Sequence, residues 1–124
     1  MGLARTVAAV FGAVYVLVGI LGFILVAGGE GDLLGLFAVN ALHNIVHVLL
    51  GAILLYGSMS YAAAIQTTRG VGAVLLLLGI LGFIIPDGLG LVPLGDNDIW
   101  LHLATGAILL ATGFMATDEA AATV

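Results

Sequence analysis

The sequence predicts an all-α integral membrane protein, a bundle of four transmembrane helices made of two parallel tandem two-helix repeats. Three observations lead to this fold class. Of the 124 residues, 63% are hydrophobic and only 7% are charged, whereas soluble domains carry about 25% charged residues. The apolar residues form four long runs, and the two halves of the chain share short motifs in the same order. The length of residues 1–124 allows a single transmembrane domain.

Each of the four apolar runs is long enough to cross about 30 Å of hydrocarbon, which takes about 20 helical residues. In lipid, backbone polar groups must be paired within their own segment, so each run is expected to be a helix. Strands are excluded for these spans by their length and by the lack of alternation. The expected helices cover residues 6–27, 34–57, 62–85 and 97–117. A polar segment, residues 58–70, is expected to connect the second helix to the third.

The two basic residues of the chain, Arg5 and Arg69, fall on one side of the membrane if the helices alternate in direction. Positively charged residues favour the cytoplasmic side. We therefore expect a multi-pass protein of the cell membrane with both termini in the cytoplasm and the acidic connections outside.

An internal repeat relates the two halves of the chain. The run Gly-Ile-Leu-Gly-Phe-Ile occurs at residues 19–24 and again at 79–84, and His47 with the run 51–55 recurs as His102 with the run 106–110. We therefore expect one repeat over about residues 5–59 and a second over about 69–116, related by an axis along the membrane normal. Small residues let helices approach closely in lipid, and six glycines of the repeat are expected at helix contacts: Gly19, Gly22, Gly51, Gly79, Gly82 and Gly106.

These motifs carry a resemblance to a known family. The run Asn40-Ala-Leu-His43-Asn44-Ile-Val-His47, followed by Gly51, resembles the signature of a bacterial and archaeal membrane family described as domain of unknown function 4383. Asp98, His102 and Gly106, spaced four residues apart, look like the counterpart in the second half. The resemblance implies four helices and a membrane location, and it supplies no activity.

A stripe of polar residues crosses the otherwise apolar second and fourth helices. At 100° per residue, its members on the second helix fall within about 100° of arc, and polar groups inside a membrane usually face the bundle interior. The stripe consists of Asn40, His43, Asn44, His47, Asp98, His102 and Thr105.

Three hypotheses compete for this stripe. The favoured one is that its residues hydrogen-bond across helix interfaces, each bond being worth roughly 0.6–2 kcal/mol. In the second, His43, His47 and His102 bind haem or a transition metal, because histidines four residues apart share one helix face; no carboxylate or thiolate is expected at their depth. In the third, the stripe lines a water-filled ion or proton path, since histidine titrates near neutrality.

Several function classes find no support in the sequence. Without cysteine there are no disulfides and no iron–sulfur or thiolate metal sites, and the net charge of −5 leaves no basic surface for nucleic acid. Ser58 and Ser60 are expected far from any histidine, and Tyr15, which could reach His47, is expected to be packing. We therefore predict a small non-catalytic structural or accessory component of the lipid bilayer, assembling with itself or with a larger membrane complex. This interpretation needs no cofactor, and its alternatives are the haem or metal protein and a small transporter or channel.

Overall fold

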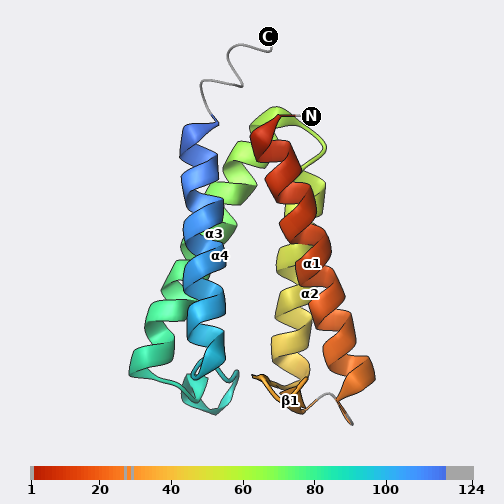
Figure 1. Cartoon of the computed structure of the whole chain (residues 1–124), viewed down its shortest axis with the longest axis vertical. Helices are drawn as coiled ribbons and strands as arrows, with labels where there is room; N and C mark the ends of the chain where they lie inside the picture. Colours follow the sequence, from red (N-terminus) through yellow and green to blue (C-terminus); the bar gives the residue numbers. More distant parts are fainter. Residues whose placement is uncertain (1, 27, 29, 117–124) are drawn as a thin grey trace.

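The computed structural model describes residues 2–26, 28 and 30–116, and in this part the chain forms four helices, as predicted. The helices run up and down in sequence order, so that α1 begins and α4 ends at the same end of the bundle (Figure 1). We call this the terminal end, and the opposite one the loop end. The elements are α1 (Leu3–Leu25), β1 (Gly31–Leu33), β2 (Phe37–Val39), α2 (Ala41–Gly57), α3 (Tyr61–Ile84), the 3-10 helix η2 (Gly88–Gly90) and α4 (Asn97–Met115). The expected helix ends at residues 27 and 117 lie outside the described residues.

Three of the helices, α1, α3 and α4, are long and apolar enough to cross a membrane. α2 has 17 residues and so extends about 25 Å, at the lower limit for a span. Large apolar side chains are exposed on every helix, among them Leu17, Leu49, Leu77 and Phe114. Such a surface matches a bilayer rather than water, and these helices identify a membrane protein.

The prediction that the second helix begins at residue 34 was wrong. Residues 31–39 form an antiparallel hairpin in which Asp32 pairs with Ala38. Leu34 and Gly35 turn the chain with φ of 54° and 67°, in the left-handed region, and helix cannot propagate through such a turn. Asn40 then starts α2, because its side chain accepts a hydrogen bond from the His43 amide at 2.8 Å.

The third helix begins one residue before its expected start at residue 62, so most of the polar segment 58–70 belongs to it. α3 already begins at Tyr61, where the Ser60 hydroxyl accepts a hydrogen bond from the Ala63 amide at 3.3 Å. Serine at this position is a strong helix start, so the polar residues that follow it lie in the first turns of α3.

Glycines mark the closest approaches within each pair of helices. A Cβ atom at Gly51 would lie 2.6 Å from the Gly12 carbonyl oxygen, and one at Gly106 would lie 2.9 Å from that of Gly72. Each of the other glycines expected at helix contacts, Gly19, Gly22, Gly79 and Gly82, likewise leaves no room for a Cβ. The sequence analysis missed Gly12 and Gly72, although they precede Gly19 and Gly79 by the same seven residues. The matching contacts accord with two repeats, and the repeat stays a prediction.

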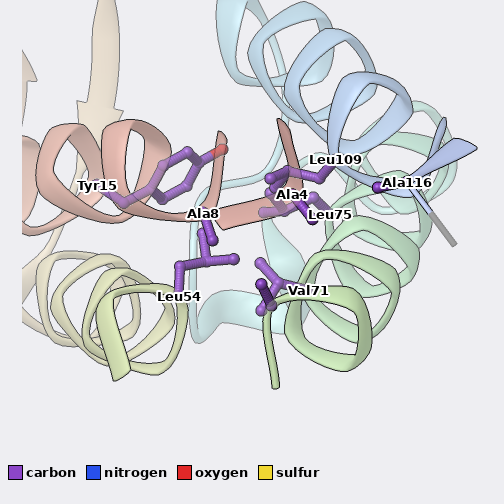
Figure 2. Close-up of a cluster of buried hydrophobic side chains, with 9 residues drawn as sticks. Ala4, Ala8, Tyr15, Leu54, Val71, Leu75, Leu109 and Ala116 are labelled. Atoms are coloured by element: carbon purple, nitrogen blue, oxygen red, sulfur yellow. The ribbon is translucent and has the colours of Figure 1, made fainter. Parts of the chain in front are cut away.

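A small apolar core joins all four helices (Figure 2). Ala4, Ala8 and Tyr15 of α1 meet Leu54 of α2, with Ala64, Val71 and Leu75 of α3 and Leu109 of α4 completing the cluster beside Ala116. The alanines bring the helix backbones close together, as small residues do in lipid.

The two arginines cap helix ends at the terminal end. The Arg5 Nε atom donates to the Ser58 carbonyl at 2.8 Å, and the Arg69 Nε atom donates to the Gly113 carbonyl at 3.0 Å. These carbonyls belong to the last turns of α2 and α4, which lack helical partners and carry the negative end of the helix dipole. Both positive charges are therefore held far from the loop end.

Candidate metal centre

Three buried histidines meet near the loop end of the bundle. His43 and His47 lie one turn apart on α2 and so share a face, and His102 projects from the first turns of α4. Their exposed fractions are only 3%, 5% and 2%. The ring centroid of His47 lies 4.8 Å from that of His43 and 6.1 Å from that of His102. We call these three residues the histidine triad; it bridges the α1–α2 pair and the α3–α4 pair.

The triad leaves several ring nitrogens without a hydrogen bond. Within the described part of the chain, no partner is found for Nδ1 of His43, both nitrogens of His47 and Nδ1 of His102. The His43 ring also hydrogen-bonds to the backbone of Ala38 in β2. The hypothesis that the histidines join helices by hydrogen bonds required a partner for each polar atom, and the triad does not meet this requirement.

Tyr15 of α1 supports the triad from the side. Its ring stacks on His47 with centroids 4.9 Å apart and an interplanar angle of 18°. Thr105 donates its hydroxyl proton to the Leu101 carbonyl at 2.7 Å, so at 2.7 Å from the Tyr15 hydroxyl it serves as the acceptor. Tyr15 therefore packs in the bundle, as expected, and its hydroxyl group bonds Thr105 rather than His47.

A carboxylate lies beside the triad, contrary to the sequence analysis. Asp98, in the first turn of α4, is only 1% exposed, and its Oδ2 atom lies 3.9 Å from Nδ1 of His43. Oδ2 has no hydrogen-bond partner among the described residues. The sequence analysis placed Asp98 in the polar stripe but expected no carboxylate at the depth of the histidines, and the structure brings its carboxyl group next to His43.

Two asparagines bind loops at the loop end of the bundle. Asn40 donates its side-chain amide to the Leu91 carbonyl at 2.8 Å, and Asn97 donates to the Leu36 carbonyl at 2.8 Å. Each asparagine lies at the start of the second helix of one pair and bonds the loop of the other pair. Asn40 therefore caps and crosslinks rather than lining the interior.

Asn44 is buried but turns away from the triad. Its side chain lies against Gly22 of α1, where an added Cβ would collide with it. Of the predicted stripe, the structure therefore brings together His43, His47, His102 and Asp98, with Thr105 one contact further away.

Two cavities flank the triad. The larger, of about 230 Å³, is lined by all three histidine rings and otherwise by apolar side chains, including Leu42, Val46, Leu78 and Leu94. We call it the triad cavity. A smaller one of about 110 Å³ lies between α1 and α4 and touches Tyr15, His47 and Thr105. The polar hollow at the loop end, lined by Asp32, Asp96 and Asn97, has no triad residue in its wall.

The triad could form a metal site. One nitrogen from each ring can be chosen so that the three atoms lie within 4.8 Å of one another. Nitrogens about 2.1 Å from a common ion can be at most about 4.2 Å apart. The nitrogens would therefore have to come about 0.6 Å closer to share one ion.

No curated protein and no solved structure matches the chain. One family model matches residues 5–115, which include the triad and nearly all of the four α-helices. Because the match covers nearly the whole sequence, the chain belongs to the family described as Domain of unknown function (DUF4383).

Proposed function

We propose that the histidine triad binds a transition-metal ion inside the bilayer, and that the protein is a small non-catalytic, metal-binding accessory component of the membrane. The single observation that carries this proposal is the convergence of three buried imidazoles, each of which has at least one ring nitrogen without a hydrogen-bond partner among the described residues. A buried polar group left unsatisfied costs roughly 1–3 kcal/mol. An ion bound by three nitrogens would remove most of that cost at one point.

The charge around the triad supports a cation. The Asp98 carboxyl is buried beside His43, and both arginines are held at the opposite end of the bundle. A buried carboxylate is costly without a compensating charge. A divalent ion at the triad would supply it within a few ångströms.

The partners of the rings also suit a metal site. Histidines that bind metals usually donate their second ring N–H to a carboxylate or backbone carbonyl, which fixes the tautomer. His43 has both kinds of group nearby, the Ala38 backbone and the Asp98 carboxyl. Imidazoles without thiolates suit zinc, copper, nickel or cobalt rather than magnesium or calcium.

The other two interpretations are less well supported. Haem iron has only two axial positions, whereas three imidazoles converge here. A conducting path requires a wet cavity open to the loop end, but the triad cavity is lined almost wholly by apolar side chains. An ion is therefore the ligand that best explains the arrangement.

Metal analysis of the purified full-length protein tests the proposal. After exposure to zinc, cobalt, nickel or copper and removal of excess metal, we expect about one equivalent of ion per chain, lost in His47→Ala. Tyr15→Phe, which keeps the ring on His47, is the matched control and should retain the ion. Less than a tenth of an equivalent of every metal, or equal binding by His47→Ala, would refute the proposal. A Soret absorption band in the protein as purified would support haem instead.

A further inference from the structure

The triad cavity has the size and the polar groups that a small ligand would need. Its volume is about 230 Å³, and its polar groups are the three histidine rings. All three belong to side chains that are more than nine-tenths buried and carry ring nitrogens without partners. An engineered apolar cavity of about 150 Å³ is enough to bind benzene. The triad cavity can therefore hold a larger ring with one polar group.

The wall of the cavity restricts the chemistry of such a ligand. Leu42, Leu78 and Leu94 offer only apolar contact, so the body of the ligand must be apolar. The polar end meets the histidine rings, whose nitrogens can donate or accept a hydrogen bond. Neither arginine is near, and the Asp98 carboxyl beside His43 would repel an anion. Phosphate and carboxylate head groups are therefore disfavoured, and a neutral hydroxyl, which both donates and accepts, fits best.

The position of the cavity points to a ligand dissolved in the bilayer. Its walls come from the membrane helices α2, α3 and α4 together with the loop that follows α3. The asparagine bonds to Leu91 and Leu36 tie the two loops to the opposite helix pairs at the loop end. Molecules that already partition into hydrocarbon can reach such a site between the helices, whereas a phospholipid head group would first have to leave the interface.

We infer that the triad cavity binds a neutral, bilayer-soluble phenol or quinol, whose ring fills the cavity and whose hydroxyl group meets the histidine triad. The inference rests on the proposed metal centre only for where the hydroxyl oxygen binds in the metal-loaded protein. A metal held by three histidines keeps an open fourth position, and the three rings that would hold it all line this cavity. In the loaded protein the hydroxyl oxygen would take that position, and in the metal-free protein it would hydrogen-bond an imidazole.

The experiment uses 1-naphthol as the probe and 1-methylnaphthalene as the analogue without a hydroxyl. Full-length protein in lipid nanodiscs is prepared with and without cobalt(II), whose visible bands report its ligands. In the metal-free protein, 1-naphthol fluorescence should change with a saturable dependence on concentration, and 1-methylnaphthalene should compete at least tenfold more weakly. In the cobalt protein, 1-naphthol should shift the visible bands and 1-methylnaphthalene should not.

Two substitutions of neighbouring leucines separate the cavity from the lipid-facing surface. Leu78 lines the cavity, whereas Leu77 is 55% exposed on the outer surface. Leu78→Trp should fill the cavity and abolish both naphthol signals while keeping the cobalt spectrum, and Leu77→Trp should behave like wild type. Equal naphthol signals in the two variants, or equal competition by 1-methylnaphthalene, would overturn the inference.

The outcomes keep the two proposals apart. A wild-type protein without a cobalt spectrum refutes the metal centre, and the fluorescence of the metal-free protein then decides the ligand site alone. A normal cobalt spectrum with no naphthol signal in either form refutes the ligand site alone.

Discussion

Asp98 carries a buried carboxyl group that a nearby cation would stabilise. Its carboxyl group is buried beside His43, 3.9 Å from Nδ1. If the triad binds a cation, Asp98→Asn should lower metal affinity by about 10- to 100-fold, the range found for residues that support metal ligands. Competition against a chelator of known affinity measures the change. Asp96→Asn is the matched control, because Asp96 is exposed and only two residues away; it should leave the affinity unchanged, and an equal loss in both variants would point to general surface charge.

Tyr15 links α1 to α4 through a single hydroxyl group. The Tyr15–Thr105 hydrogen bond is 2.7 Å long, while the tyrosine ring independently stacks on His47. Tyr15→Phe should therefore lower the free energy of unfolding by about 0.6–1.7 kcal/mol, as interhelical hydrogen bonds in membrane proteins do. Unfolding in mixed detergent gives this value, and a double-mutant cycle with Thr105→Val isolates the bond. Additive losses would show that the two hydroxyls do not interact.

The site could be predicted only in part from individual residues. The spacing of His43 and His47 places both on one helix face, and the expected repeat pairs His47 with His102, so a meeting of the three rings was foreseeable. The approach of Asp98 to His43 was not, because it joins α4 to α2. Contacts between helices far apart in the chain leave no local pattern in the sequence.

At the scale of the helices, the glycines decide how closely two elements approach. Gly51 and Gly106 face neighbouring backbone, whereas a Cβ at Gly70 would meet nothing within 4 Å. Gly51→Ala and Gly106→Ala should each lower the thermal midpoint, since backbone must shift to make room. Gly70→Ala, in α3, should be neutral or stabilising by up to about 1 kcal/mol, because alanine favours helix over glycine. Equal effects at the three positions would mean that contact between helices is not the cause.

The start of the second helix shows that hydropathy does not predict helix boundaries. Residues 34–39 are mostly apolar, so they read as part of a span, yet they form a hairpin that packs through Leu33 and Val39 on Val26. The available signals were local ones: glycines at residues 31 and 35, and Asn40 and Ser60 as helix starts. Apolar length predicts that a helix exists, whereas caps and turns predict where it begins.

At the scale of the whole molecule, a metal at the triad would join the two helix pairs. His43 and His47 come from one pair and His102 from the other. A ligand that binds only the folded state, at about 100 times its dissociation constant, adds about 2.7 kcal/mol of stability. Wild-type protein should therefore melt at a higher temperature with zinc, and His47→Ala should show no gain. A zinc-induced gain of the same size in His47→Ala would place the ion elsewhere.

The expected orientation of the whole molecule in the membrane depends on its two basic residues. Arg5 and Arg69 both bond to carbonyls at the terminal end, while Glu30 and Asp96 lie in the connections of the loop end. Because basic residues favour the cytoplasmic side, the terminal end should be inside and the loop end outside.

The chain has no cysteine, so single cysteines can report each end without background. Glu30→Cys and Asp96→Cys should react with a membrane-impermeant maleimide in intact cells. Met59→Cys, in the exposed turn between α2 and α3, should react only after permeabilisation. The opposite pattern would reverse the orientation, and labelling of all three in intact cells would contradict a four-span bundle, because each helix that crosses the membrane must place the connections at its two ends on opposite sides.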